Sequence, residues 1–262
     1  MLISIIIPTY NRKEFFKKTI RSILSQSYTN FELIVVSDGS DDGTTEFVNN
    51  ISDSRIKFIQ LKKNFGYPAK PRNEGIKVSK GDYLALCDDD DVWAPGKLQA
   101  QVNKIIQGYN FIFTDLYFLN DFTRPLIKEI YYRLLLKLLV NYFPVKISYI
   151  LFSFTNPIIN SSVIFSKSLL NDKLFYEGLK MRASEDYHMW INIYRLSKPY
   201  YLNNKFVGYL VHESNISSNY KANIDRCIII FKEFKVTSIY TFTFKLLGLF
   251  FFGFRKILYN LF

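Results

Sequence analysis

The sequence is poor in cysteine and lacks the patterns that mark several large classes of protein. Its 262 residues include only two cysteines, Cys87 and Cys227, which lie far apart and fit no metal-ligand spacing. The chain does not open with a charged segment, an apolar run and a small-residue cleavage site, so we expect no signal peptide. We therefore expect a reducing compartment and two free thiols, not a disulfide.

Several nucleotide-binding and nucleic-acid-binding signatures are also missing. No G-x-G-x-x-G follows the first strand-like run and no P-loop pattern occurs, which argues against NAD or FAD enzymes and P-loop proteins. The chain carries a net charge of +11, yet residues 1–121 are balanced in charge. It has no helix-turn-helix, zinc finger or aromatic RNA-binding signature, so we expect no nucleic-acid partner.

The positive charge is concentrated in two apolar segments. Nine of the eleven excess charges lie in residues 122–150 and 221–262, which are rich in Leu, Ile, Phe and Tyr. This mixture favours an anionic membrane surface as a partner. The longest uncharged run of the tail, Leu246–Phe254, is well short of the roughly 20 residues that span a bilayer. We therefore expect residues 238–262 to lie on a membrane as a helix and not to cross it.

The first half of the chain alternates between strand-like and helix-like runs, and 48% of all residues are hydrophobic, enough for a large core. We predict strands at 2–8, 31–37, 55–61, 82–87 and 111–115, and helices from an N-cap at Asn11, at 44–51, at 73–79 and from Pro95. This alternation predicts a mostly parallel sheet with helices on both faces. Later predictions are helices at 126–153, 183–196 and 223–235, and strands at 157–166 and 200–211.

Polar residues follow three of the predicted strands, at residues 8–11, 37–40 and 88–91. Because ligands of parallel sheets bind beyond the carboxyl ends of the strands, we expect these clusters to converge. The third cluster holds four adjacent carboxylates, which repel one another and raise their pKa values. An isolated acidic run is usually a solvated turn, but this one follows a buried strand. Such carboxylates suit Mg²⁺ or Mn²⁺, which takes one or two of them and can neutralise a diphosphate leaving group.

Five segments together resemble the family 2 glycosyltransferases, which have the GT-A fold. They are SIIIPTYNR (4–12), ILSQSYTNFELIVVSDGSDDGT (23–44), NFGYPAKPRNEGI (64–76), GDYLALCDDDDVWAPGKLQ (81–99) and SEDYHMW (184–190). Each is degenerate alone, but five in order make a specific match. The resemblance implies an α/β, Rossmann-like, mostly parallel central sheet flanked by helices. It further implies a nucleotide-sugar-binding half (1–121) and an acceptor-binding half (122–220). The basic, apolar composition predicts a helical, membrane-associating tail (221–262).

The resemblance also implies which residues bind the nucleotide. Pro8, Thr9 and Tyr10 would lie beside it, and Asp38 would recognise the base. The family often has two adjacent acidic residues where this chain has Ser37 and Asp38. Here the first of them is Ser37, so the contact with the ribose is not implied.

The phosphate and metal sites follow from two further motifs. Arg72, Asp88 and Asp89 would lie near the nucleotide and its phosphates. The metal-binding D-x-D motif ends at Asp90, the first candidate ligand of a Mn²⁺ or Mg²⁺ cofactor. Asp88 and His212 are further candidate ligands. A lone histidine is as often an ordinary polar residue, which is the rival interpretation of His212.

The pair Glu185-Asp186 is similar to the E-D motif of the family, in which the second acid is the general base. A sugar hydroxyl is a poor nucleophile, and a nearby carboxylate can take its proton as it attacks. Acids are also common in the first turn of a helix, where they complement its dipole. No Q-x-x-R-W pattern follows, so the resemblance implies single transfers and not processive polymerisation.

These observations predict a metal-dependent, inverting, non-processive hexosyltransferase of bacterial-type cell-surface polysaccharide or glycolipid biosynthesis. Its donor would be a nucleotide-diphosphate sugar and its acceptor a hydroxyl of a glycan or lipid-linked sugar, at the cytoplasmic face of the membrane. Three alternatives remain open. They are a polyprenyl-phosphate sugar synthase, a membrane-associated protein that binds nucleotide-sugars without turnover, and a nucleotidyltransferase.

Overall fold

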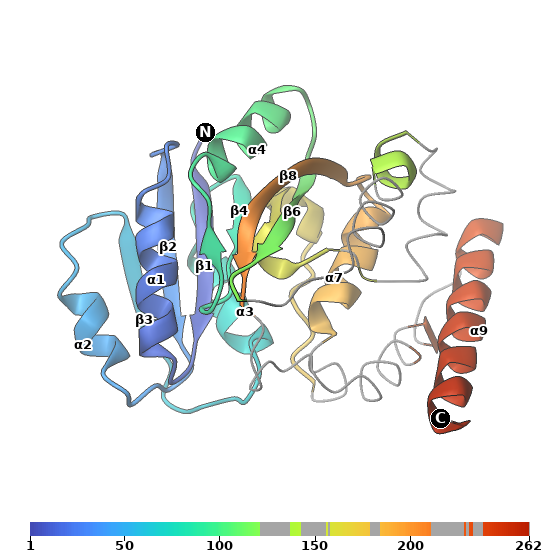
Figure 1. Cartoon of the computed structure of the whole chain (residues 1–262), viewed down its shortest axis with the longest axis horizontal. Helices are drawn as coiled ribbons and strands as arrows, with labels where there is room; N and C mark the ends of the chain where they lie inside the picture. The colour runs from blue at the N-terminus through green and yellow to red at the C-terminus, as the bar shows by residue number, and fades with distance from the viewer. Residues whose placement is uncertain are drawn as a thin grey trace.

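An eight-stranded sheet forms the centre of the protein, in the order β3-β2-β1-β4-β7-β6-β8-β5 (Figure 1). The computed structural model describes residues 1–120, 137–142, 156, 158–178, 184–210, 228, 231–232 and 238–261. The strands are β1 (Ile3–Thr9), β2 (Phe31–Ser37), β3 (Ile56–Gln60), β4 (Tyr83–Leu86), β5 (Val92–Trp93), β6 (Phe111–Phe118), β7 (Val163–Ser166) and β8 (Tyr200–Tyr209).

Helices cover both faces of this sheet. Helices α1 and α4 pack on one face, and α3 and α7 pack on the other. The helices are α1 (Lys13–Leu24), α2 (Thr44–Asn49), α3 (Ala69–Val78), α4 (Lys97–Ile106), η1 (Lys137–Tyr142), η2 (Asn160–Ser162), η3 (Lys167–Leu170), α7 (Glu185–Tyr194) and α9 (Ile239–Leu261). The predicted α/β architecture is confirmed.

The apolar runs of the central strands are buried on both sides because alternate residues enter opposite layers. In β1, Ile5 and Ile7 join the layer under α1 and α4, whereas Ile6 joins the layer under α3 and α7. Every residue of β1 and β2 is buried. Continuous apolar runs are typical of strands covered on both faces, which is why these two were predictable.

Two strands of the sheet, β7 and β5, run antiparallel to their neighbours. Strands β3, β2, β1 and β4 are parallel, as predicted, but β7 lies antiparallel between β4 and β6. Strand β8 then pairs in parallel with β6, and the register shifts on either side of Asp115. The short strand β5, which was not predicted, pairs antiparallel with β8.

Two helix starts differ from prediction. The expected N-cap at Asn11 is wrong, because Arg12 holds that position and Asn11 has a left-handed backbone with φ 49°. The side chain of Asn11 exchanges two hydrogen bonds with Asp41 in place of capping the helix. Helix α3 begins at Ala69 and not near residue 73, since Pro71 falls in its first turn, where the missing N–H of proline costs nothing.

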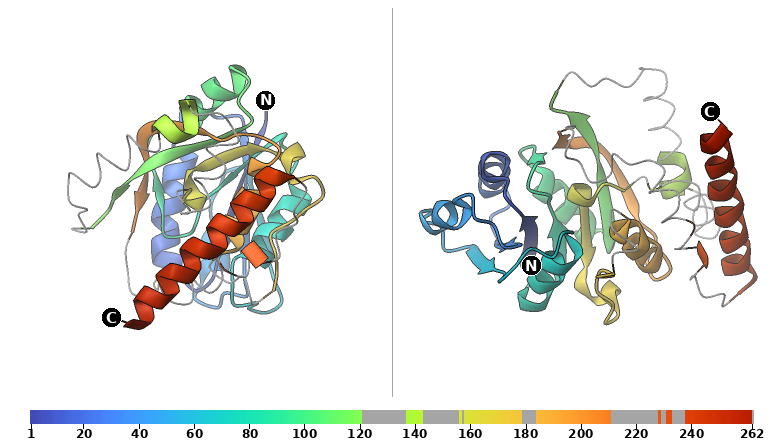
Figure 2. Two further views of the ribbon diagram at one scale, coloured as in Figure 1. Left: turned by 90° about the vertical axis from the view of Figure 1, so that its right-hand side faces the viewer. Right: turned by 90° about the horizontal axis from the view of Figure 1, so that it is seen from below.

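The tail forms the 23-residue helix α9, which lies at the opposite end of the molecule from β3 (Figures 1 and 2). Gly248 on one of its sides is buried against Phe231. No helix among the described residues is both long and apolar enough to cross a membrane. Most of the helices predicted at 126–153 and 223–235, and the boundaries predicted at residues 121 and 220, lie outside the described residues.

Replacing Trp190 by alanine should destabilise the protein by about 3–5 kcal/mol, because the indole is fully buried and alanine leaves a cavity. Its ring lies 5.7 Å, between centroids, from both Phe111 and Phe165. Equilibrium unfolding in urea measures the effect. Ile106→Ala is the matched control, since Ile106 is 76% exposed and its truncation should change stability by less than about 0.5 kcal/mol. Equal losses of stability in the two variants would contradict the placement of Trp190 in the core.

Candidate functional site

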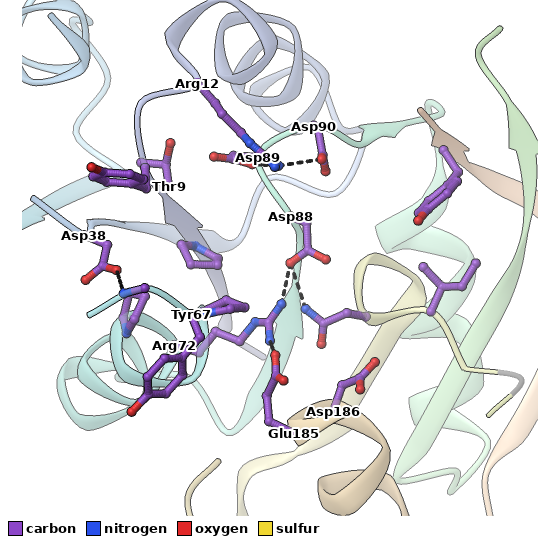
Figure 3. Close-up of a pocket in the computed structure, with 18 of the residues that line it drawn as sticks. Thr9, Arg12, Asp38, Tyr67, Arg72, Asp88, Asp89, Asp90, Glu185 and Asp186 are labelled. Atoms are coloured by element: carbon purple, nitrogen blue, oxygen red, sulfur yellow. Dashed lines mark hydrogen bonds and ion pairs between the residues drawn. The ribbon is translucent and has the colours of Figure 1, made fainter. Parts of the chain in front are cut away.

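A cavity of about 600 Å³ opens beyond the carboxyl ends of β1, β2 and β4 (Figure 3). It is lined by all but one of the site residues predicted from the sequence: Pro8, Thr9, Tyr10, Asp38, Arg72, Asp88, Asp89, Asp90 and Asp186. The exception, His212, lies outside the described residues. The structure therefore brings together residues from five separate parts of the chain, while the role of each remains a prediction.

The carboxylate of Asp38, just after β2, holds a loop of the cavity wall. It accepts hydrogen bonds from the backbone N–H groups of Phe65, at 3.0 Å, and Gly66, at 3.3 Å. Gly39 permits this close approach, because a Cβ there would lie 2.8 Å from the backbone of Asn64. Burial raises the pKa of Asp38, and the two N–H groups partly offset that rise. Asp38 thus shapes the end of the cavity where the base of the nucleotide was predicted to bind.

Arg72 is the buried bridge between the acidic run and helix α7. Its Nη2 donates to Asp88 Oδ1 at 2.6 Å, and its Nη1 donates to Glu185 Oε1 at 2.9 Å (Figure 3). The Arg72 side chain is only 4% exposed. Burial would lower the Arg72 pKa, but Asp88 and Glu185 raise it above its ordinary value. The guanidinium therefore stays charged and joins the acidic run to helix α7, whose Glu185 lies 113 residues from Arg72 in sequence.

A second arginine neutralises the middle of the acidic run. Arg12 Nη1 lies 2.7 Å from Asp90 Oδ2 and 3.3 Å from Asp89 Oδ1 (Figure 3). Asp89 is buried, and this burial, followed by the charge of Asp90, raises its pKa to about 7. Arg12 works in the opposite direction and lowers that pKa. The mutual repulsion expected of the run is thus countered by protein cations.

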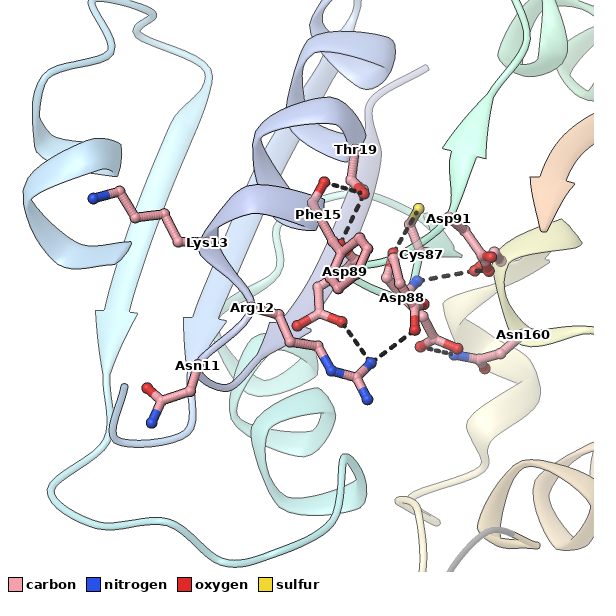
Figure 4. Close-up of polar contacts among 12 residues, drawn as sticks. Asn11, Arg12, Lys13, Phe15, Thr19, Cys87, Asp88, Asp89, Asp91 and Asn160 are labelled. Carbon is pink, nitrogen blue, oxygen red and sulfur yellow. Dashed lines mark hydrogen bonds and ion pairs between the residues drawn. The ribbon is translucent and has the colours of Figure 1, made fainter. Parts of the chain in front are cut away.

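Asp91, the fourth carboxylate of the run, is buried. Through Ser161 it fixes the backbone of Asp88, the first carboxylate of the run. It accepts a short hydrogen bond from Ser161 Oγ, which in turn accepts one from the N–H of Asp88 at 2.9 Å. Burial, and then the charge of Asp90, raises the pKa of Asp91 well above its ordinary value. Asn160 donates from Nδ2 to Asp88 Oδ1 at 3.0 Å (Figure 4). Asp88 is therefore held from several sides.

The donor set of the acidic run fits a divalent cation that is shared with a ligand. Among the described residues, no three His, Cys, Asp or Glu side chains converge as a complete protein metal site. Mg²⁺ and similar ions often take only one or two protein carboxylates and complete their shell with water and phosphate oxygens. Asp88 and Asp90 both line the cavity and could hold such an ion.

Asp186 lies in the first turn of α7, on the far side of Arg72 from the acidic run (Figure 3). Its Oδ1 accepts from the N–H of Tyr187 at 2.6 Å, and Asn156 Nδ2 lies 3.4 Å from its Oδ2. Desolvation and the neighbouring charge of Glu185 raise its pKa to about 7, whereas Arg72 lowers it. A half-buried carboxylate with this pKa can accept a proton at neutral pH.

The wall of the cavity formed by β6, β8 and the segment before β7 is largely apolar. It consists of Leu116, Phe118, Ile158, Ile159 and Tyr209. The rings of Phe118 and Tyr209, from neighbouring strands, lie 6.3 Å apart and nearly perpendicular. The cavity thus has a loop-bound end near Asp38 and an apolar end near Tyr209.

Sequence reasoning missed the partners of the predicted acids. Arg12 is the last residue of SIIIPTYNR, but nothing in the sequence indicated that it contacts Asp89 and Asp90. Asn160 and Ser161 fall inside the strand predicted at 157–166, but the structure places them in the short helix η2 and begins β7 only at Val163, so that prediction is wrong for these two residues. The apolar wall could not be assigned either, because its residues come from strands whose pairing was not predicted.

Replacing Arg72 by glutamine should destabilise the protein by about 3–5 kcal/mol, since it leaves Asp88 and Glu185 without their buried partner. Urea unfolding measures this loss. Lys70→Gln is the control, because Lys70 belongs to the same helix and pairs with Glu74 near the surface. That change should cost less than about 1 kcal/mol. An Arg72→Gln loss no larger than the control's would show that the bridge is not structural.

Sequence comparison gives relatives over most of the chain. The profile described as Glycosyl transferase family 2 matches residues 4–171. The chain is 33% identical over 229 residues to the Escherichia coli UDP-Glc:alpha-D-GlcNAc-diphosphoundecaprenol beta-1,3-glucosyltransferase WfaP, covering 83% of this chain and 80% of that protein. It is 42% identical over 123 residues to an uncharacterized glycosyltransferase of Haemophilus influenzae, covering 44% of this chain and 49% of that one. The match covers half or less of the length of that protein and of the glycosyltransferases of Rickettsia bellii and Rickettsia conorii.

Solved structures show the same fold. S. aureus TarS in complex with UDP-GlcNAc superposes with a TM-score of 0.75 at 22% identity, covering 96% of this chain and 71% of that one. The mannosyltransferase PcManGT of Pyrobaculum calidifontis, in complex with GDP-Man and Mn²⁺, gives 0.70 at 15% identity, with 95% and 69% covered. These likenesses confirm the predicted GT-A architecture, and together with the sequence match they establish that the chain belongs to glycosyl transferase family 2.

Proposed function

We propose that this glycosyltransferase moves a sugar from a nucleotide-diphosphate donor to an acceptor hydroxyl with inversion at the anomeric carbon, in a single transfer that depends on a divalent cation. One observation carries the proposal. Asp38, the acidic run and Asp186 line a single cavity, although they are separated by 50 or more residues in sequence. A donor site, a site for a charged leaving group and a base are thus within reach of one bound substrate pair.

The nucleotide would occupy the end of the cavity between Thr9, Tyr10 and the loop that Asp38 holds. A rigid loop suits this task, because a preformed site loses less freedom when its ligand binds. The relative WfaP uses UDP-Glc and TarS binds UDP-GlcNAc by name. We therefore propose a UDP-sugar as the donor.

The diphosphate would lie against the acidic run, where Asp88 and Asp90 are the residues proposed to hold the cation. When bound there, a divalent cation would offset the negative charge that builds up on the departing diphosphate. Arg12 lines the same part of the cavity and adds a permanent positive charge. Arg72, with both of its terminal nitrogens on carboxylates, would act by holding Asp88 and Glu185 in place.

Asp186 is the proposed general base. Its carboxylate would accept the proton of the acceptor hydroxyl as that oxygen attacks the anomeric carbon and the bond to the diphosphate oxygen breaks. Attack from the face opposite the leaving group gives inversion. A pKa near 7 favours this role, since a carboxylate of ordinary pKa is a weaker base. Asn156 and the N–H of Tyr187 would orient the carboxylate.

The acceptor would enter over the apolar wall that Phe118 and Tyr209 help to form. Aromatic side chains suit the apolar face of a sugar ring, and the acceptor named for WfaP is a sugar on diphosphoundecaprenol. We propose an acceptor of that class, a sugar linked to a lipid diphosphate, in cell-surface polysaccharide or glycolipid synthesis.

Helix α9 would keep the enzyme near such an acceptor. Ile239, Phe242, Leu246 and Phe250 are 45–74% exposed and recur every three or four residues, so they share one face. The side marked by Gly248 packs against the rest of the chain. An exposed apolar stripe on a basic segment suits an anionic lipid surface at the cytoplasmic side of the membrane.

Asp186→Asn should lower kcat by roughly 10²–10⁴-fold, because an amide cannot accept the proton, while the affinity for UDP changes by less than about threefold. Release of UDP from UDP-Glc, with mass analysis of a GlcNAc-diphospholipid acceptor, measures the reaction. In the wild type, kcat/KM should fall as the pH drops below about 7, where Asp186 becomes protonated. This acidic limb should be absent from the residual activity of the variant.

The matched control is Asp172→Asn, an exposed acid outside the cavity whose left-handed backbone, φ 61°, asparagine also tolerates. It should retain full activity. Undiminished turnover by Asp186→Asn would refute its role as base. Transfer to a lipid monophosphate and not to a sugar would indicate a polyprenyl-phosphate sugar synthase, and release of pyrophosphate would indicate a nucleotidyltransferase.

Replacing Phe242, Leu246 and Phe250 together by serine should weaken binding to vesicles containing anionic phosphatidylglycerol by at least about tenfold, because each side chain loses apolar contact with lipid. Sedimentation with vesicles measures the binding. The control replaces Ile106 and Leu196, two exposed apolar residues away from α9, by serine and should bind like the wild type. Equal binding by the triple variant and the wild type would exclude α9 as the membrane contact.

A further inference from the structure

The two arginines on the acidic run are held in different ways. The Arg72 side chain is 4% exposed, and its two terminal nitrogens donate to carboxylates from different elements. The Arg12 side chain is 23% exposed and lines the cavity, and the same nitrogen, Nη1, makes its contacts with Asp89 and Asp90. Arg72 thus connects two elements of the fold, whereas Arg12 lies in the cavity wall beside two carboxylates of the acidic run.

The backbone that carries Arg12 is nonetheless firmly fixed. Asn11 exchanges hydrogen bonds of 2.8 and 2.9 Å with Asp41, and its N–H donates to Ser40 Oγ at 3.1 Å. On the other side, the N–H of Lys13 donates to Asp42 at 2.8 Å. The left-handed conformation of Asn11 completes the turn, and asparagine tolerates it better than most residues. The backbone that carries Arg12 is thus anchored, while its side chain, which is 23% exposed, reaches Asp89 (Figure 4).

Arg12 and a divalent cation would compete for the same oxygens. The guanidinium donates directly to Asp90 Oδ2 and approaches Asp89 Oδ1, so it neutralises the carboxylate that was the first candidate metal ligand. A second cation at Asp90 would also be repelled by the guanidinium at short range. An arginine released from a carboxylate can bind phosphate oxygens with the same planar fork of N–H groups.

We propose that Arg12 is an exchangeable counter-ion: its guanidinium occupies Asp90 while the site is empty and moves to the diphosphate when metal and donor bind together. This inference rests on the proposed function, from which it takes the cation at Asp88 and Asp90. Its consequence is that metal alone binds weakly, because it must displace Arg12 without compensation. Metal together with a diphosphate binds tightly, because the displaced guanidinium gains a new partner. The binding of metal and the binding of diphosphate are then positively coupled, so each ligand increases the affinity for the other.

The test measures two affinities of the full chain that should move in opposite directions when Arg12 is removed. The first is for Mn²⁺ alone, from the electron paramagnetic resonance signal of the free ion. The second is for the preformed Mn²⁺–pyrophosphate complex, by calorimetry. In Arg12→Gln, Mn²⁺ alone should bind roughly 5- to 100-fold more tightly than in the wild type, and Mn²⁺–pyrophosphate should bind more weakly by a similar factor.

Two further variants make the comparison specific. Lys17→Gln removes the same charge from the helix that follows Arg12, but Lys17 pairs with Glu14, lies over the Phe47 ring and does not line the cavity, so both affinities should match the wild type. Arg12→Lys keeps the charge but loses the fork, so it should lie between the wild type and Arg12→Gln in both measurements. Circular dichroism and the urea midpoint show whether each variant is folded.

The outcomes separate this inference from the function on which it rests. Unchanged or weaker binding of Mn²⁺ alone by Arg12→Gln would refute the exchange. So would weaker binding in both measurements, which is expected if Arg12 only maintains the shape of the site. If neither the wild type nor Arg12→Gln bound Mn²⁺ in either form, the cation of the proposed function would itself be wrong. Sugar transfer in the absence of metal would then show that the reaction needs no divalent cation.

Discussion

The structure depends on neutralising many carboxylates in a cavity with limited access to water. Six acidic side chains line it: Asp38, Asp88, Asp89, Asp90, Glu185 and Asp186. In such surroundings like charges repel far more strongly than in bulk water, and burial alone already penalises each charged form. Two arginines and a set of backbone and side-chain N–H groups make the arrangement stable, and they do so by joining segments that are distant in sequence.

This need for neutralisation connects the two sides of the proposed reaction. Arg72 links Asp88, at the end of β4, to Glu185, next to the proposed base. A displacement of helix α7 would therefore be transmitted to the acidic run, which is proposed to face the diphosphate. The same guanidinium lowers the pKa of Asp186, which burial and Glu185 raise. One buried cation therefore acts both on the basicity of Asp186, which burial and Glu185 raise more than Arg72 lowers, and on the placement of Asp88.

Much of the fold was predictable from the sequence because the central strands have a strong local signal. Apolar runs predicted β1 and β2, and the rule that ligands bind at the carboxyl ends of parallel strands placed three polar clusters at one site. The rest depended on tertiary contacts. The antiparallel insertion of β7 follows from which edges are left to pair, and the left-handed Asn11 follows from its contact with Asp41.

The same limit explains which site residues were found. Acids that follow buried strands are visible in a single sequence, and so is an E-D pair at the start of a helix. Their partners are not, because Arg12, Asn160 and Ser161 owe their roles to contacts across 70 or more residues. A sequence reveals a concentration of charge more readily than it reveals how that charge is balanced.

The irregular pairing of β6 with β8 determines which side chains reach the apolar end of the cavity. Opposite Thr114 and Asp115 of β6 stand Leu202 and Lys205 of β8, so β8 contains extra residues at this point. Side chains alternate along a strand, and the number of these extra residues decides which face of the sheet Tyr209 occupies. A shift of this pairing by one position would turn Tyr209 away from the cavity while the acids stayed in place. Under the proposed function, the pairing of β6 with β8 would then alter the acceptor end of the cavity separately from the donor end.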